Sequence, residues 1–262
     1  MFYKRKMIFL PIIVSIFAIV NTYENMLSYN RMEVAYMSKY VKIYVNPYGD
    51  KTDLFKKDCI SIDEGLTVLV GANGTGKTTL LHCLSESLEK DNIPVASFNN
   101  LYDGGRYNID YFLDKENFEM ASLSATSSEG ENIMVSLGEF CAKLKRFIEK
   151  GQFNKYHTFP SKNDTVSKSN ERWMLIDATD SGLSIDNIVE LKKLFYFILE
   201  DSKQKGISLF IIVSANEYEM ANQESCFDVR KGEYIHFASY EEYKDFILES
   251  REEKERRIKN EG

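Results

Sequence analysis

One segment of the chain has the residue types and spacing of a phosphate-binding loop. Residues 71–78 read Gly-Ala-Asn-Gly-Thr-Gly-Lys-Thr, which fits the pattern Gly-x-x-x-x-Gly-Lys-Ser/Thr without a mismatch. Glycines let the backbone curl so that successive N–H groups point at phosphate oxygens, and the following helix adds its dipole. The segment predicts a nucleoside triphosphate site in which Lys77 faces the β- and γ-phosphates and the Thr78 hydroxyl binds Mg²⁺. The expected nucleotide-binding residues are Gly71, Ala72, Asn73, Gly74, Thr75, Gly76, Lys77, Thr78 and Thr79.

A carboxylate that could serve the Mg²⁺ side of this site lies further along the chain. Four apolar residues, 173–176, precede Asp177, as in a buried strand that ends at an acid. We expect this strand to neighbour the strand that leads into the loop, so that Asp177 holds the ion or one of its waters. Many buried strands end in this way, and the preceding phosphate loop makes the pattern informative.

The elements around these residues alternate between strands and helices. A continuous apolar run at 66–70 predicts a buried strand that leads into the loop, and a leucine stripe at 77–90 predicts the helix that follows. The alternation predicts an α/β fold with a mostly parallel core sheet flanked by helices and a small antiparallel part. Other strands are expected at 41–45, 59–62, 94–98, 173–176 and 208–213, helices at 131–150 and 185–201, and a hairpin with arms at 227–230 and 234–237.

Composition excludes several classes of protein. The 262 residues are 44% hydrophobic and 28% charged, which is ordinary globular usage and excludes wholesale disorder and fibrous repeats. A net charge of −7 gives no support to a chain-wide nucleic-acid surface. The 4 cysteines form no Cys-x-x-Cys pair, which favours reduced cytosolic thiols over a zinc site or disulfides.

The first 36 residues differ from the rest of the chain. A basic cluster at 4–6 precedes an apolar run at 7–20, which is shorter than the ~20 residues of a membrane span. Three interpretations stay open: translation that begins at Met32 or Met37, a membrane-contacting helix, or a segment folded onto the body.

We therefore divide the chain into residues 1–36 and a domain at 37–262. The domain includes a polar loop at 151–172 and a charged helix at 239–262, which we interpret as a solvated face because acids dilute its basic residues. We expect a cytoplasmic protein, with membrane association through residues 7–20 left open.

Four segments, in order, resemble the motifs of ABC-type ATPases. Gly71–Thr79 is similar to the Walker A motif, and Ser127–Glu131 resembles the signature in a Ser-x-Gly-Glu variant. Asp177–Ser184 resembles the Walker B and D-loop block of chromosome-maintenance (SMC) and recombination-repair ATPases, and Val213–Asn216 lies where the family has its switch histidine. The resemblance covers residues 37–237.

The resemblance implies a P-loop NTPase head, of the ABC-ATPase type, that dimerises around two ATP molecules. Each ATP would lie between the Walker A motif of one subunit and the signature of the other, which adds Ser128 and Gly130 to the nucleotide site. The 51 positions from Lys77 to Ser128 leave no room for a coiled-coil arm, so a compact stand-alone head is expected.

The chain departs from the family at the residues that activate water. Ala178 stands where the family has its catalytic glutamate, and Asn216 stands in place of the histidine. Loss of a general base typically costs ~10²–10⁴ in rate, so slow hydrolysis is expected. Asp180 is the nearby carboxylate that could position water, which makes Asp180 and Asn216 the candidate catalytic residues.

Two further family positions have several candidates here. No glutamine occurs between residues 95 and 125 for the glutamine loop, and the polar replacements are Asn99, Asn100 and Asp103. Tyr44 or Tyr48 could stack on adenine, although core packing explains either tyrosine equally well.

Three functions stay open at this point. In the first, ATP drives head dimerisation to switch an unidentified protein partner, and hydrolysis to ADP and phosphate is slow. In the second, the chain is a regulatory module that binds ATP without hydrolysing it. In the third, it is the ATPase subunit of an ABC transporter. Nucleic acid as a partner has no support from the charge.

Overall fold

The computed structural model describes residues 37–49, 53–100, 122, 144, 146–152 and 167–261. The N-terminal segment 1–36, the signature-like segment Ser127–Glu131 and Asp103 lie outside the described residues. Within the described ranges, no helix is both long and apolar enough to cross a membrane. The elements in chain order are β1 (Ser38–Lys42), β2 (Cys59–Asp63), β3 (Gly65–Val70), α2 (Lys77–Lys90), β4 (Val95–Asn99), β5 (Glu171–Asp177), α7 (Ile185–Gln204), β6 (Ser208–Ser214), α8 (Tyr218–Ala221), β7 (Ser225–Asp228), β8 (Glu233–Ile235) and α9 (Tyr240–Glu261).

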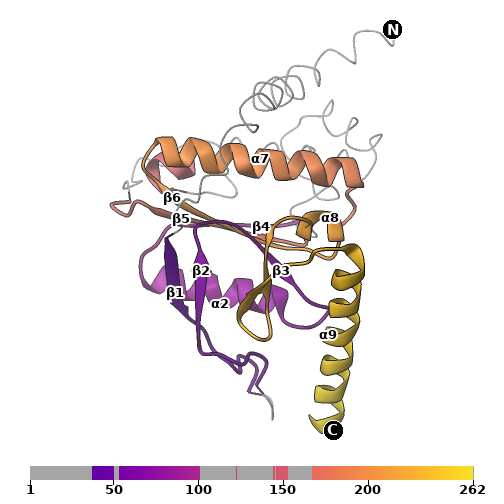
Figure 1. The fold of residues 1–262 in the computed structure, drawn as a ribbon. Coiled ribbons are helices and arrows are strands. Elements are labelled where there is room, and N and C mark those ends of the chain that lie inside the picture. The colour runs from indigo at the N-terminus through magenta and orange to yellow at the C-terminus, as the bar shows by residue number, and fades with distance from the viewer. Residues whose placement is uncertain are drawn as a thin grey trace.

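A six-stranded sheet in the order β4-β5-β6-β3-β7-β8 forms the centre of the fold (Figure 1). The first five strands are parallel, and β8 pairs antiparallel with β7. Strands β5 and β6 are buried along nearly their whole length, which is why their sequences are continuous apolar runs. The predicted α/β class with a mostly parallel core sheet is confirmed.

A separate pair of antiparallel strands, β1 and β2, forms the predicted small antiparallel part. The strand expected at 41–45 instead spans Ser38–Lys42. The ladder ends where Lys42 pairs with Cys59, because Cys59 is the first residue of the partner strand. The apolar alternation continues past that point, so the pattern alone does not mark the end of β1.

Helices α7 and α2 lie on opposite faces of the large sheet (Figure 1). Alternate residues of each strand point to opposite faces, so one strand serves both cores. In β5, Met174 packs in the core beneath α7 and Trp173 packs in the core beneath α2. Trp173 is fully buried and stacks on Phe210 of β6, with ring centroids 4.3 Å apart and an interplanar angle of 4°.

The strand order differs from one expectation. The strand that ends at Asp177 was expected next to the strand that leads into the phosphate loop, but β6 lies between β5 and β3. An apolar strand that is buried on both faces fits either position equally well, so its sequence does not specify its neighbour. The two strands nevertheless end at the same edge of the sheet, because all three are parallel.

Candidate nucleotide-binding site

The loop between β3 and α2 has the curled backbone that its glycines permit. Gly71 and Gly76 have φ angles of 145° and 105°, a backbone conformation that residues with a side chain rarely adopt. A Cβ atom at Gly71 would lie 2.6 Å from the Thr75 hydroxyl, which donates a hydrogen bond of 2.8 Å to the carbonyl of Ala72. The loop therefore folds tightly over the start of α2, as a phosphate cradle requires.

Lys77 is buried against this loop. Its Nζ atom donates to the carbonyls of Gly71, at 2.5 Å, and Ala72, at 3.4 Å. Burial lowers the pKa of the Lys77 ammonium, while the nearby carboxylates of Asp180 and Asp177 act to raise it. A buried cation is thus held beside the loop by neutral carbonyls and two acids.

The first turn of α2 suits an anion. Gly76 is the N-cap residue, no side chain of the described residues caps the helix, and the first turn contains no acidic residue. The first N–H groups of a helix lack partners within the helix and carry its positive dipole end. Together with Lys77, this helix end fits the negative charge of a polyphosphate.

Asp177, at the end of β5, is hydrogen-bonded to the ends of β4 and β6. Its Oδ2 atom accepts a hydrogen bond of 3.1 Å from the side-chain amide of Asn99, its register partner on β4. Its Oδ1 atom accepts from the Ser214 hydroxyl at the end of β6, at 2.5 Å, and from the N–H of Ala178, at 3.1 Å. The carboxylate is thereby oriented at the carboxyl edge of the sheet, the usual place for a ligand in this kind of fold.

The structure separates the two adjacent asparagines that were candidates for the glutamine-loop position. Asn99 contacts Asp177, whereas the Asn100 amide donates to the carbonyls of Ala178, at 3.2 Å, and Ser181, at 2.8 Å. Asn100 thus holds the turn after β5. Ala178 begins that turn with a φ of 51°, a left-handed conformation that is uncommon for a residue with a side chain.

Asp180 and Asn216, the candidate catalytic residues, lie side by side. The Asp180 Oδ2 atom accepts hydrogen bonds of 2.6 Å from the backbone N–H groups of Asn216 and Glu217. Asp180 is 3% exposed, and its Oδ1 atom is buried without a partner among the described residues. Burial raises the pKa of this carboxyl. One oxygen of Asp180 therefore holds a loop, while the Asn216 side chain is exposed.

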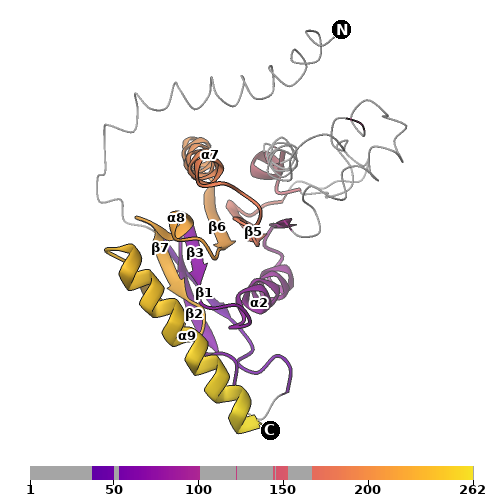
Figure 2. The ribbon, with the colours of Figure 1, turned by 90° about the vertical axis from the view of Figure 1, so that its right-hand side faces the viewer.

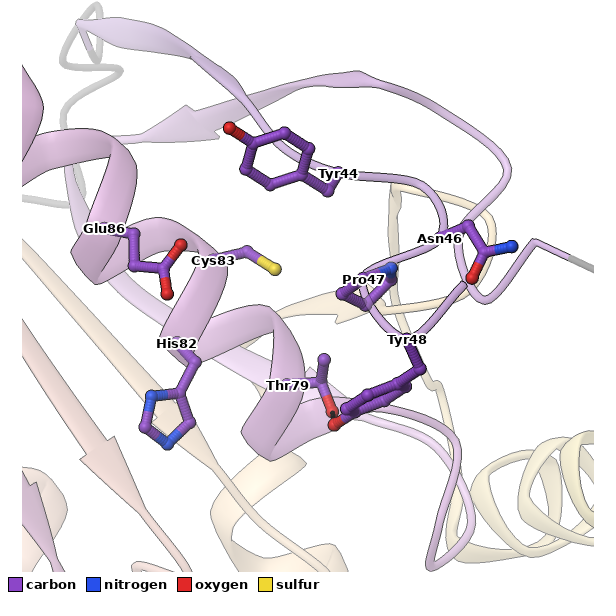
Figure 3. A pocket seen from close by; sticks show the side chains of 8 residues that line it. All are labelled: Tyr44, Asn46, Pro47, Tyr48, Thr79, His82, Cys83 and Glu86. Carbon is purple, nitrogen blue, oxygen red and sulfur yellow. Dashed lines mark hydrogen bonds between the residues drawn. The ribbon is translucent and has the colours of Figure 1, made fainter. Parts of the chain in front are cut away.

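A pocket of about 510 Å³ opens beside the first turns of α2 (Figure 3). Tyr44 and Tyr48 line one side of the pocket, and Thr79 and His82 of α2 line the other. The Tyr48 hydroxyl lies 2.7 Å from the Thr79 hydroxyl, so Tyr48 reaches the end of the phosphate loop motif. Tyr44 instead lies under the Lys90 ammonium, 5.3 Å from its ring centroid.

The residues fit a magnesium ion that depends on a nucleotide. Thr78 offers an exposed hydroxyl on the first turn of α2, and Asp177 offers an oriented carboxylate. The described residues contain no group of three or more His, Cys, Asp or Glu side chains that could hold a metal ion. Mg²⁺ is commonly bound by one or two protein oxygens together with substrate phosphates, and that arrangement suits these two residues.

The helix α9 contributes contacts that the sequence pattern did not indicate. The Ala72 N–H donates a hydrogen bond of 3.2 Å to the Ser250 hydroxyl, and the Lys254 ammonium donates one of 3.0 Å to the Asn73 carbonyl. The interpretation of the C-terminal helix as a solvated face is therefore wrong for this side of it. The spacing of Tyr243, Ser250 and Lys254, seven and then four residues apart, places them on one face of the helix. Because Tyr243 is buried, that face packs against the body of the protein.

The known proteins that match this chain have low sequence identity and low structural similarity to it. No protein-family model matches the chain, and no curated protein matches its sequence. Among matching solved structures, cbiO1 from Clostridium perfringens, described as part of the ABC transporter complex cbiONQ, has 15% identity and a TM-score of 0.42 over 76% of this chain and 87% of that chain.

Two other matching structures are longer proteins. A bacterial Atm1-family ABC exporter with ATP bound has 14% identity and a TM-score of 0.40 over 86% of this chain and 43% of that chain. A DNA replication initiation factor has 12% identity and a TM-score of 0.29 over 59% of this chain and 32% of that chain. This chain therefore matches less than half the length of either protein.

Proposed function

We propose that the chain binds ATP with Mg²⁺ at residues 71–79 and acts as an ABC-type ATPase. The observation that carries this proposal is the buried Lys77 ammonium, held against the glycine loop at an uncapped helix start and close to Asp177 and Asp180. A lysine so placed can exchange its two carbonyl contacts for phosphate oxygens without leaving the loop. Charged hydrogen bonds to phosphate are stronger than those to neutral carbonyls.

Each neighbouring residue has a defined part in this proposal. The loop N–H groups and Lys77 bind the phosphates, and Thr78 and Asp177 hold the ion, whose charge neutralises the β- and γ-phosphates. Asn99 orients Asp177 through its amide. The adenine ring occupies the pocket at Tyr48, because the Tyr48 hydroxyl already contacts Thr79 at the end of the loop.

Hydrolysis is slow in this proposal because the residue that follows Asp177 is Ala178 and not an acid. Ala178 has no group that can orient or deprotonate water, and Asp180 uses one oxygen to hold two backbone N–H groups. ATP that persists would keep two heads together and so switch a protein partner. Ser128 and Gly130 of the second subunit would complete each site, and both residues lie outside the described part of the chain.

One observation favours the second candidate function, an ATP-binding regulatory module without turnover. Asp180 is buried and commits one of its two carboxylate oxygens to the loop, which restricts its use as a water-positioning group, and Asn216 has no charge to replace it. Steady-state release of phosphate by the purified full chain distinguishes the two functions. Any rate that disappears in Asp177→Asn supports the ATPase, whereas binding without turnover supports the regulatory module.

The binding proposal is tested by calorimetric titration of the full chain with ATP and Mg²⁺. We expect Lys77→Ala to lower the affinity by about 100-fold or more, because it removes a charged contact made in a buried setting. Lys205→Ala, at the far end of α7, is the matched control and should bind as the unaltered chain does. Equal ATP affinity in the Lys77→Ala and unaltered chains would contradict the proposal.

Dimerisation is tested separately by light scattering after gel filtration, with and without ATP. A doubling of mass only with ATP, which is lost in Lys77→Ala, supports the head-switching model. A monomer under saturating ATP contradicts that model but leaves ATP binding intact.

A further inference from the structure

Helix α9 links two parts of the nucleotide site. Near its start, the Tyr243 hydroxyl donates a hydrogen bond of 2.7 Å to the carbonyl of Asn216, and the Tyr243 ring is buried in the core. Phe246 and Ile247 pack against the same core one turn later. The helix then runs past the loop that leads into α2 (Figures 1 and 2). Its contact face changes from apolar to polar where it meets that loop.

Ser250 and Lys254, four residues apart and thus on one face of α9, make this polar contact. Ser250 accepts from the Ala72 N–H, and Lys254 donates to the Asn73 carbonyl. A Cβ atom built on Gly74 would lie 3.5 Å from Cδ and 3.7 Å from Nζ of Lys254. The ammonium therefore lies directly over a loop glycine, on the stretch whose N–H groups would face phosphate.

The charge of Lys254 is not neutralised by an ion pair with any described residue, unlike the charges of Arg251 and Arg256 on the same helix. Arg251 pairs with Glu255 and Arg256 pairs with Glu252 along the helix, at 3.2 and 3.8 Å. Within the described residues, no carboxylate lies within ion-pair distance of Lys254, and its hydrogen bond goes to a neutral carbonyl. A lysine ammonium has three donors, so two remain for another acceptor.

We propose that Lys254 is a second phosphate-binding cation of the nucleotide site, and that Ser250 positions the loop against α9 for this purpose. The inference rests on the proposed binding of ATP at residues 71–79. Lys77 contacts the loop through its first two carbonyls and Lys254 through the third, so the two ammonium groups hold neighbouring positions along one loop. The ligand is the polyphosphate of a nucleoside triphosphate.

The proposal is tested by calorimetric titration of ATP with Mg²⁺ into variants of the full chain. Lys254→Ala should raise the dissociation constant for ATP about three- to tenfold. This is the effect expected for the loss of one charged hydrogen bond whose strength is reduced by partial exposure to solvent. Lys254→Arg should restore most of the affinity, and Arg251→Ala, on the exposed side of the same helix, should change nothing. The loss should shrink at high ionic strength because salt screens a partly exposed charge.

Lys254→Gln separates a phosphate contact from a structural one. Glutamine can still donate to the Asn73 carbonyl but has no charge, so we expect it to lose as much ATP affinity as alanine, at an unchanged melting temperature. Full affinity in Lys254→Gln, or unchanged or tighter binding in Lys254→Ala, overturns the inference; tighter binding would mean that α9 competes with nucleotide.

Lys77→Ala, measured in parallel, tells the two proposals apart. If Lys77→Ala loses ATP and Lys254→Ala does not, the role of Lys254 alone is wrong. If neither variant differs from the unaltered chain, the proposed nucleotide site is wrong and the inference falls with it.

Discussion

Asp180 holds Asn216 through a hydrogen bond of 2.6 Å from the Asn216 N–H to the Asp180 Oδ2 atom. This contact joins the turn after β5 to the connection between β6 and α8, two segments that belong to neighbouring parallel strands. The Asn216 carbonyl in turn accepts from Tyr243 of α9. Asp180 thus supports the backbone on which both Asn216 and the start of α9 depend.

Asp180→Asn and Asp180→Ala should therefore differ in stability. Asparagine keeps an oxygen that can accept from the Asn216 and Glu217 N–H groups, whereas alanine leaves both donors without this partner. We expect Asp180→Ala to lower the free energy of unfolding by about 1–3 kcal/mol relative to Asp180→Asn. Urea denaturation measures the difference, and equal midpoints for the two variants would show that the contact does not stabilise the fold.

The same carboxyl predicts a dependence of stability on pH. Burial raises the pKa of Asp180 above its ordinary value of 3.8, so the folded state binds this proton more tightly than the unfolded state does. The protonated carboxyl therefore adds to the free energy of unfolding. This stabilisation is fully present below the ordinary pKa of 3.8 and is lost as pH rises through the raised pKa of the folded state.

The measurement is the free energy of unfolding of the unaltered chain minus that of Asp180→Asn, from pH 3.5 upward. Other titrating groups, such as Glu64, whose pKa burial also raises, cancel in this difference. We expect the difference to fall as pH rises and then to level off. A difference that rises with pH would mean that the folded state favours the charged form.

Ala178→Glu should restore a general base beside Asp177. We expect the steady-state rate of ATP hydrolysis to rise about 100-fold, within the range that a positioned base contributes. A dimer that forms with ATP should become shorter-lived as a result. An unaltered chain that already turns over several ATP molecules per second would show that another group activates water.

Ala178→Gly is the matched control for this change. The φ of 51° at Ala178 costs a residue with a Cβ atom roughly 1–2 kcal/mol, so glycine should raise stability without raising the rate. A rate increase in Ala178→Gly would mean that backbone strain, and not the missing acid, limits hydrolysis.

Tyr48→Ala should weaken ATP binding through the base and not through the phosphates. Stacking on an aromatic side chain is worth about 1–3 kcal/mol per base, which corresponds to about five- to 150-fold in affinity. Tyr40→Ala is the control, since Tyr40 is also exposed but does not line the pocket. Titration with inorganic triphosphate completes the test, because Tyr48→Ala should not alter its affinity; an equal loss for both ligands would contradict a base contact.

Much of the fold follows from local sequence patterns. Apolar runs identify the parallel strands, and the expected helix at 77–90 coincides with α2. The strand order does not follow, because β5 and β6 have the same apolar character and either could lie beside β3.

The phosphate loop, too, could be predicted, because its glycines and Lys77 are contiguous in sequence. The distant contacts could not. Asn99 and Asn100 are equal candidates in the sequence, and only the register of β4 on β5 places Asn99 opposite Asp177. Lys254 lies 181 positions from Asn73, in a helix whose many charges conceal the side that packs.

The stacked pair Trp173 and Phe210 has a practical consequence, because Trp173 is the single tryptophan of the chain. An indole with no solvent exposure, in the core beneath α2, emits light at short wavelength and shifts to longer wavelength only when water reaches it. Its fluorescence therefore reports the melting of the central sheet, free of signal from any other indole. Trp173 is thus an intrinsic fluorescence probe of unfolding, four residues before Asp177 in the sequence.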